Sequence, residues 1–325
     1  MAFLFVGGED VDFPNGSALS LLGSPAFRSG YARAAFWSAF SGNIMKSTTF
    51  QGGAVTSAWL TFRLYTVSNV TSQGFFGFGL SGTNKGLFVG GGAAGNNLAI
   101  LKYDGTTWTV LAASSGTELN NVGVNKIDLH VSSYGATATV TLYYNGTQIA
   151  TYTGDVTVSG VTNLDSVYYY ATGGEFGVSE IVVSDVDTRS LVGLVTLALT
   201  GQGTTDSWTA GTYSDINAIG YSDANPAYTN TTGQDEQFAV NGLPAGTWTI
   251  AAVKTTVRAA QGTGSAATKV NLGYSDGTTP AFGGTAQSAG AAYGTLERYD
   301  TTNPVTATAW AQADFTGLEM DLRSA

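Results

Sequence analysis

Acidic residues that alternate along the chain are the side chains best suited to catalysis. Two carboxylates at a fixed separation across a cleft can hydrolyse a glycosidic bond, and residues two apart on a strand share one face. Alternating pairs occur at Asp10 with Asp12, at Asp185 with Asp187, and at Glu319 with Asp321. The first two pairs lie in predicted loops and the third lies at the C-terminal end. We therefore predict no catalytic residues and a non-enzymatic protein, with a glycoside hydrolase or polysaccharide lyase as a further alternative.

His130 is the only histidine in the chain and the next candidate for a general base. It falls on the polar face of its predicted strand, and no Ser or Cys nucleophile motif accompanies it. We interpret it as an exposed histidine among Ser and Thr residues. Cysteine is absent from the sequence, which excludes disulfides, a thiolate nucleophile and a Cys-based zinc site.

The acidic loop at residues 9–16 invites a calcium-binding interpretation. An EF-hand loop needs Asp or Asn at alternating ligand positions, followed by Gly. Here Pro14 occupies the third ligand position and Asn15 is displaced by one. We predict a solvated acidic turn, and a cation bound by Asp10 and Asp12 stays the open alternative. The sequence implies no other metal site and no cofactor.

Aromatic residues could bind a carbohydrate by stacking their rings on sugar rings. The candidate glycan contacts are Trp37, Trp208 and Tyr169, the last from the run Tyr168-Tyr169-Tyr170. In an alternating strand at least one of the three tyrosines must face inward, so core packing is the alternative for each candidate. Trp108 follows a hairpin turn by a few residues, and there we favour packing over binding.

The composition excludes several classes of partner. The chain has 325 residues, a formal net charge of −10 and only 11% charged residues. A protein that binds a phosphate backbone needs clustered Lys and Arg, so no nucleic acid is expected. No apolar run is long enough to span a membrane, and residues 1–6 lack the basic start of a secretory signal. Neither membrane insertion nor a signal peptide is therefore predicted.

Alternating segments bounded by turns predict an all-β protein. Residues 54–65 and 124–153 alternate apolar and polar side chains, the period of half-buried strands. Asp104-Gly105 and Asn145-Gly146 predict hairpin turns, and the apolar segment 192–200 predicts a further strand. We expect two antiparallel β-sandwich domains of jelly-roll type in series, with no helix longer than about two turns.

Residues 176–190 mark the junction between the two domains. Ile181 and Val183 face one side of a predicted strand, and the polar stretch 185–190 follows it. A half-buried strand that ends in a polar stretch is typical of a domain boundary. The predicted domains are residues 1–187 and residues 188–325.

Two segments of the first domain carry a resemblance to known sandwiches. Residues 125–131 read Asn-Lys-Ile-Asp-Leu-His-Val, and residues 140–149 read Val-Thr-Leu-Tyr-Tyr-Asn-Gly-Thr-Gln-Ile. In these strands and their Asn-Gly hairpin the domain resembles a concanavalin A-like or laminin-G-like jelly-roll sandwich. The resemblance implies the fold and not one function, because such sandwiches serve lectins, glycosidases and structural proteins alike.

Short motifs of the second half resemble structural proteins of tailed bacteriophages and related prophage or gene-transfer particles. They are residues 178–190, residues 206–211, Asn303-Pro304 with Ala309-Trp310, and residues 315–322. The resemblance implies a non-enzymatic virion protein on the exposed surface of the tail or head, such as a fibre, spike or decoration. It supplies no catalytic residues.

A virion location also implies particular partners. Other virion proteins would bind the chain, and it would form a homo-oligomer, because a neighbouring subunit can cover the edge strands of an open sandwich. A glycan of the host surface is the implied ligand. The alternative function is that of a carbohydrate-binding, lectin-like module, which would use the aromatic contacts named above.

Overall fold

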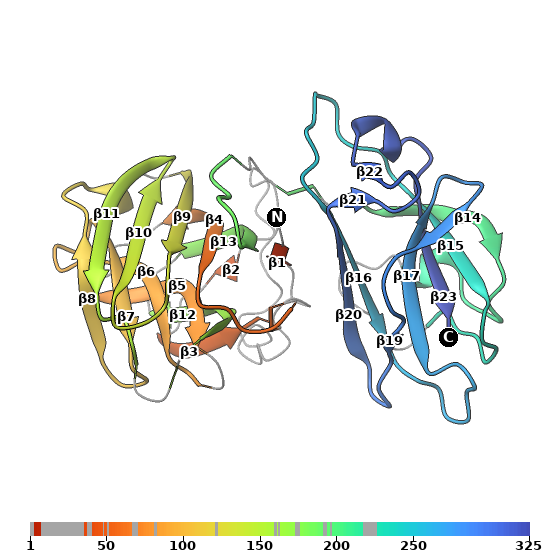
Figure 1. Cartoon of the computed structure of the whole chain (residues 1–325), viewed down its shortest axis with the longest axis horizontal. Helices are drawn as coiled ribbons and strands as arrows, with labels where there is room; N and C mark the ends of the chain where they lie inside the picture. Colours follow the sequence, from red (N-terminus) through yellow and green to blue (C-terminus); the bar gives the residue numbers. More distant parts are fainter. Residues whose placement is uncertain are drawn as a thin grey trace. The chain divides into compact units, whose positions relative to one another are not determined.

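The computed structural model describes residues 3–7, 36–37, 41–47, 49–50, 52–66, 71–80, 83–120, 123–158, 161, 163–172, 176–190, 194–195, 197–216 and 226–325. The chain forms two compact units, Met1–Gly193 and Leu194–Ala325, which Figure 1 colours from red to green and from green to blue. Both units are built from antiparallel sheets. The prediction of two antiparallel β-sandwich domains in series is therefore confirmed.

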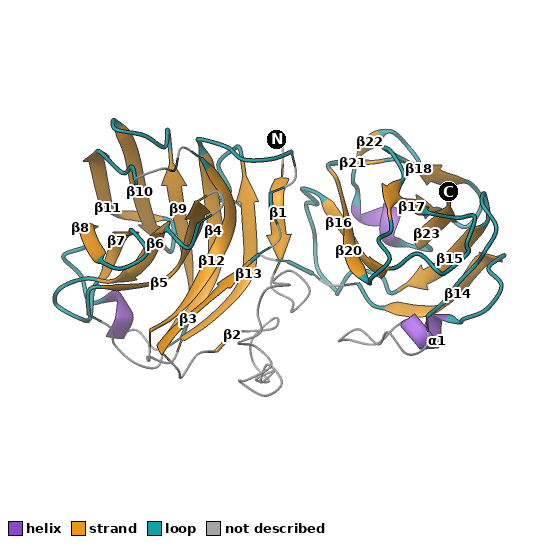
Figure 2. Ribbon diagram, turned by 90° about the horizontal axis from the view of Figure 1, so that it is seen from below, coloured by secondary structure: helices purple, strands orange, loops and turns teal. Residues whose placement is uncertain are grey.

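The first unit consists of two sheets, which we call A and B (Figure 2). Sheet A has the order β1-β13-β4-β9-β10-β11, with β2 paired to β13. Its strands are β1 (Phe3–Gly7), β2 (Phe36–Trp37), β4 (Ala58–Thr66), β9 (Val124–Val131), β10 (Ala138–Tyr144), β11 (Thr147–Gly154) and β13 (Phe176–Ser184). Sheet B has the order β3-β12-β5-β6-β7-β8. Its strands are β3 (Ser41–Lys46), β5 (Gln73–Leu80), β6 (Gly86–Gly91), β7 (Leu98–Tyr103), β8 (Trp108–Ala113) and β12 (Leu164–Thr172), and a 3-10 turn spans Glu118–Asn120.

The core of the first unit lies between the facing sides of these sheets. Sheet A contributes alternate residues such as Leu60, Phe62 and Leu129, and sheet B contributes Phe76 and Val89, all fully buried. Each buried apolar side chain of this size stabilises the fold by about 1.5–3 kcal/mol relative to an exposed one. The alternation seen in the sequence thus sorts side chains into a core face and an outer face on each sheet.

A β-bulge interrupts strand β13 of sheet A. Glu180 and Ile181 together face a single residue of β4, and Glu180 has a φ of 51°. This left-handed conformation is uncommon for a residue with a side chain, and bulges are a usual place for such a conformation. The bulge leaves Ile181 and Val183 in the core, while Glu180 binds Arg63 Nε through Oε2 at 3.0 Å. Predicting Ile181 and Val183 on one face was correct.

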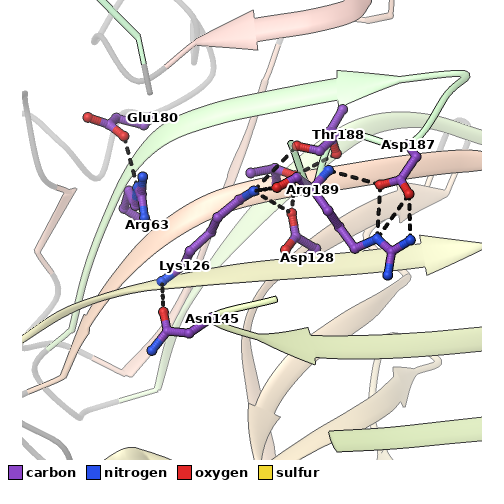
Figure 3. A network of polar contacts seen from close by, with 9 residues as sticks. Arg63, Lys126, Asp128, Asn145, Glu180, Asp187, Thr188 and Arg189 are labelled. Atoms are coloured by element: carbon purple, nitrogen blue, oxygen red, sulfur yellow. Dashed lines mark hydrogen bonds and ion pairs between the residues drawn. The ribbon is translucent and has the colours of Figure 1, made fainter. Parts of the chain in front are cut away.

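The polar segment after β13 packs on the outer face of sheet A. Thr188 is fully buried, and its hydroxyl lies 2.5 Å from that of Thr61 on β4. Lys126 Nζ donates to the carbonyl oxygens of Thr188 at 3.4 Å and Arg189 at 2.5 Å (Figure 3). Because these contacts hold residues 188 and 189 on the first unit, the compact units divide after Gly193 and not after Asp187.

The second unit contains one large sheet, which we call sheet C, and two small ones. Sheet C has the order β14-β15-β23-β17-β18, with β19 paired to β17, and the small sheets pair β16 with β20 and β21 with β22. The strands are β14 (Leu199–Asp206), β15 (Asp235–Val240), β16 (Val253–Ala259), β17 (Lys269–Ser275), β18 (Pro280–Phe282), β19 (Gln287–Ser288), β20 (Gly294–Asp300), β21 (Thr302–Asn303), β22 (Thr308–Ala309) and β23 (Glu319–Ser324). A short helix, α1 (Tyr213–Ile216), and a 3-10 turn at Gln312–Phe315 complete the described part.

Two apolar clusters hold the second unit together. Phe238, Leu272 and Leu322 of sheet C pack against Leu296 of β20. The second cluster consists of Tyr274, Trp310, Phe315 and Leu318, the last three of which lie in the closing motif of residues 303–322. Those motif residues are therefore packing residues of this unit.

Some sequence-based predictions about local structure differ from the observed elements. The strand expected at 192–200 begins only at Leu199 and continues through polar residues to Asp206. The hairpin at Asn145-Gly146 is confirmed, because both residues have positive φ, 49° and 82°, as a type I′ turn requires. Among the described residues, no helix has both the length and the apolar character needed to cross a membrane.

Candidate functional site

Strand β5 of sheet B has a bare outer face. Its sequence alternates Phe with Gly, so that Phe76 and Phe78 enter the core while Gly77 and Gly79 face outward. A methyl group on Gly79 would lie 2.3 Å from Tyr168 Cε1. The missing side chains leave room above this strand for large side chains from its neighbours.

Five aromatic rings fill that room, and we call them the aromatic face: Phe88 of β6, Tyr103 of β7, Trp108 of β8, and Tyr168 and Tyr170 of β12. Trp108 stacks on Tyr103 with ring centroids 4.4 Å apart and planes 27° apart. The Trp108 centroid lies 5.0 Å from that of Phe88 and 5.0 Å from that of Tyr170, both edge to face. Aromatic pairs favour these distances and angles, so the rings hold one another in place.

The members of the aromatic face differ in exposure. Phe88 and Tyr168 are fully buried and Tyr103 is 8% exposed, whereas Trp108 and Tyr170 are only partly buried. The rings of Trp108 and Tyr170 therefore form its accessible part. Because the buried rings lie beneath them, this accessible part rests on a rigid support.

The tyrosine hydroxyl groups are tied to nearby backbone. Tyr103 OH donates to the Gly105 carbonyl at 2.8 Å, and Tyr168 OH donates to the Thr83 carbonyl. Burial raises the pKa of Tyr168 to about 12. Burial, and then the Tyr170 hydroxyl, raise the pKa of Tyr103. Both side chains are thus neutral donors at neutral pH.

The β7–β8 hairpin places Trp108 opposite Tyr103. The two residues are register partners, and the turn between them is closed by the Asp104 carboxylate. Its Oδ1 accepts hydrogen bonds from Thr106 N at 2.9 Å and Thr107 N at 2.7 Å. These bonds lower the pKa of Asp104. The turn predicted at Asp104-Gly105 is present, and Trp108 packs as predicted, although its ring also stays partly exposed.

The residues proposed from sequence as glycan contacts do not come together. Tyr169 is 1% exposed in the core of the first unit, because it alternates with the outward-facing Tyr168 and Tyr170. It therefore cannot stack on a sugar, and this assignment is wrong. Trp208 belongs to the second unit, where it packs partly buried against the core and donates Nε1 to the Gln234 carbonyl at 3.2 Å. The backbone of Trp37 pairs with Gly177, and its side chain lies outside the described part.

A second group of rings lies on the outer face of sheet A. Trp59 stacks on His130 with centroids 4.1 Å apart, and the Arg189 guanidinium lies 5.1 Å from the Trp59 centroid and 4.5 Å from that of Tyr143. Asp187 holds this guanidinium, with Arg189 Nη2 2.6 Å from Asp187 Oδ2. That hydrogen bond lowers the pKa of Asp187. His130 is thus not the freely exposed histidine that the sequence suggested.

The acidic pairs offer no open catalytic site among the described residues. Asp10 and Asp12, with the rest of the loop 9–16, lie outside the described part. Asp187 is engaged by Arg189. Glu319 and Asp321 share one face of β23, but they are only 8% and 0% exposed, and burial raises the pKa of Asp321 to about 6. A substrate has no direct access to this pair.

Within the described ranges, no three His, Cys, Asp or Glu side chains lie close enough together to hold a metal ion. What the aromatic face offers instead is apolar ring surface with neutral hydroxyl groups at its border. Such a surface suits a ligand that combines apolar C–H faces with hydroxyl groups.

Comparisons with known proteins find solved structures of low similarity and no matching sequence. No family model matches the chain, and no curated protein matches it significantly. Similar solved structures include the alginate lyase Aly36B, with 12% identity and a TM-score of 0.36 over 53% of this chain and 90% of the lyase. A carbohydrate-binding module from Bacillus subtilis has 9% identity and a TM-score of 0.30, over 46% of this chain and 91% of the module. An endo-β-1,4-glucuronan lyase from Trichoderma reesei has 12% identity and a TM-score of 0.31, over 50% and 84%.

The sequence-based prediction that the protein is not an enzyme is wrong, because it excluded a class to which two of these similar structures, both polysaccharide lyases, belong. Paired carboxylates are a requirement of glycosidases. A lyase cleaves after proton abstraction, for which Tyr, Lys or His can serve as the base. The lack of an accessible carboxylate pair in the described residues thus leaves lyase chemistry open, and TM-scores this low assign no activity to this chain.

Proposed function

We propose that the first unit binds carbohydrate on the aromatic face of sheet B. The observation that carries this proposal is the pair of partly exposed rings, Trp108 and Tyr170, supported from below by the buried Phe88, Tyr103 and Tyr168. A ring that is already immobile loses little conformational entropy when it binds a ligand. The apolar face of a sugar ring is the ligand that this surface suits best.

The charge of the surroundings favours a neutral saccharide. The aromatic face itself contains no charged residue. Asp104, in the turn beside it, is engaged by the backbone of that turn and by the charge of Lys85. A polyuronate would need a cation beside the rings that no carboxylate already engages. Neutral glucans, galactans and xylans are therefore the first ligands to test.

Titration calorimetry of the full chain against neutral and uronate oligosaccharides tests this proposal. We expect binding to a neutral oligosaccharide, and at least a tenfold loss of affinity in Trp108→Ala and in Tyr170→Ala. Trp248→Ala is the matched control, because Trp248 is a partly exposed tryptophan of the second unit with its own hydrogen bond to Pro244. Absence of binding across the panel at millimolar ligand, or equal affinity in Trp108→Ala, would refute the proposal.

The setting that we propose for this binding is the surface of a phage particle, on the tail or head. This rests on the motifs of residues 178–325, and the host glycan would then be the ligand of the aromatic face. The oligomeric state and the virion partners stay predictions. Mass spectrometry of purified particles tests the location, and absence of the chain from them would remove the virion hypothesis while leaving carbohydrate binding intact.

A further inference from the structure

Among the buried side-chain oxygen atoms of the second unit that have no hydrogen-bond donor within the described part of the chain, three lie in sheet C. They are Gln237 Oε1, Glu319 Oε2 and Asp321 Oδ1, and their residues are 3%, 8% and 0% exposed. An unsatisfied buried acceptor destabilises the folded chain, and more so when it is charged. Three of them together require an explanation.

These oxygens belong to neighbouring positions on one face of sheet C. Glu319 and Asp321 are two residues apart on β23 and thus share a face. Gln237 on β15 is the register partner of Asp321, and its Nε2 donates to Asp321 Oδ2 at 2.9 Å. The amide head group of Gln237 therefore lies directly against this carboxylate.

An irregular stretch of β14 brings further oxygen atoms to the same place. The register of β14 against β15 shifts between Gln202 and Asp206. Within that shift, Thr204 N and Thr204 Oγ1 both lie 2.9 Å from Glu319 Oε1, and Thr204 Oγ1 is 3.3 Å from the Gly277 carbonyl oxygen. The stretch thus adds a hydroxyl group beside Glu319, and the Gly277 carbonyl lies beside that hydroxyl.

Glycine at position 203 brings this stretch close to Gln237. A methyl group on Gly203 would lie 2.7 Å from both Cβ and the carbonyl carbon of Gln237. Only a residue without a side chain lets the backbone approach so closely. The close approach is consistent with the burial of the three oxygens.

The local charges are unbalanced. Asp235 and Arg323 are register partners on the same face of sheet C as Asp321. Arg323 is committed to Asp235 through two contacts of 2.6 Å. Neither Glu319 nor Asp321 has a cationic side-chain partner among the described residues, and two buried carboxylates without one are costly.

We propose that this place is a binding site for a hard divalent cation of the calcium type, with Gln237, Glu319 and Asp321 as its side-chain ligands. Calcium accepts carboxylate, amide and carbonyl oxygens in flexible geometry, whereas magnesium demands near-ideal octahedral geometry and retains several waters. The site has two carboxylates and one amide oxygen, with the Thr204 hydroxyl beside Glu319 and the Gly277 carbonyl next to that hydroxyl. A cation there would satisfy the three oxygens and balance the charge.

The test uses the full chain, freed of metal with a chelator and titrated with calcium chloride. We expect one calcium ion per chain in native mass spectrometry, and a thermal unfolding midpoint that rises with calcium concentration. Glu319→Gln and Asp321→Asn should each weaken calcium binding at least tenfold. Two substitutions are used so that the test survives if one variant fails to fold.

Two control variants test whether the calcium response arises at this site. Glu236→Gln changes a buried carboxylate of the same sheet whose Oε2 is satisfied by Ser207 N at 3.0 Å and Trp208 N at 2.9 Å, so it should keep its calcium response. Asp10→Asn combined with Asp12→Asn should also keep it. A wild-type chain whose stability does not respond to calcium, or a response that survives Glu319→Gln or is lost in the Asp10/Asp12 variant, would overturn the proposal.

Discussion

Lys126 and Asp128 point to the same face of β9, and Lys126 Nζ lies 3.5 Å from Asp128 Oδ1. Asp128 is fully buried and Lys126 is 9% exposed. The Thr61 hydroxyl lies 2.5 Å from the same carboxylate oxygen. Burial lowers the pKa of Lys126, and Asp128 opposes that shift. The same Lys126 Nζ donates to the carbonyl oxygens of Thr188 and Arg189, and these hydrogen bonds hold the segment after β13 on the first unit (Figure 3).

Replacing Lys126 by Met should destabilise the first unit by about 3–5 kcal/mol, because it leaves Asp128 buried without its cation. Chemical denaturation measures the effect. Lys126→Met combined with Asp128→Leu should recover much of the loss, since both charges are then removed. Lys102→Met is the control, because the contact of Lys102 with the Thr157 carbonyl is exposed, and it should change stability by less than about 0.5 kcal/mol.

The single imidazole of His130 should titrate below its ordinary range. Burial lowers the pKa of His130, with Arg189 acting in the same direction and Asp187 opposing them. Protonation is therefore harder in the folded chain than in the unfolded one, whose pKa is about 6.5. The stability of the first unit should be complete above that pH and should fall as the pH drops below it.

Because the chain has one histidine, its imidazole proton resonance gives the pKa of His130 directly by NMR. His130→Gln should lose the drop in stability below about pH 6.5. A folded-state pKa at or above the unfolded value would contradict the stacked, half-buried environment on Trp59.

Adding a methyl group at Gly74 should disturb the aromatic face. A Cβ there would lie 2.5 Å from Trp108 Cζ3 and 2.5 Å from Phe88 Cβ. We expect Gly74→Ala to cost about 1–3 kcal/mol through overpacking, to change the near-ultraviolet circular dichroism of Trp108, and to weaken carbohydrate binding. Gly135→Ala is the control, because nothing lies within 4 Å of its added carbon. An unchanged spectrum in Gly74→Ala would show that the ring does not occupy this place.

The type I′ turn at Asn145-Gly146 should respond to loss of its asparagine. Asn145 has a φ of 49°, and its Oδ1 accepts a hydrogen bond from Lys126 N at 2.8 Å. Asn145→Ala should cost about 1–2 kcal/mol from the left-handed backbone, and loss of the hydrogen bond adds to it. Asn145→Gly removes only the side-chain hydrogen bonds, with Lys126 N and with Asn125 Oδ1, so thermal unfolding should show a smaller loss.

Local patterns predicted the sheets well, and the candidate site poorly. The alternation around Leu60 and Leu129 and the Asn145-Gly146 pair are determined by neighbouring residues, and both correspond to the observed structure. The aromatic face joins residues as distant as Phe88 and Tyr170, so no local pattern contains it.

A signal for the aromatic face was nevertheless present in the sequence. The Gly-Phe alternation of residues 74–80 indicates a strand with one bare face. Tyr169 was the wrong choice in its run because the phase of β12 sends it inward, and that phase depends on pairing with β3 and β5. The β13 bulge likewise depends on strand pairing and left no mark on the sequence pattern.

The position of Thr188 and Arg189 determines where a fragment that contains the first unit should end. A fragment that stops at residue 187 would lose the two carbonyl groups that accept hydrogen bonds from Lys126 and the guanidinium that covers Trp59 and Tyr143. It would expose two aromatic rings and would be prone to aggregation. Recombinant expression of the first unit, or its transfer by recombination into another protein, should therefore extend through residue 193.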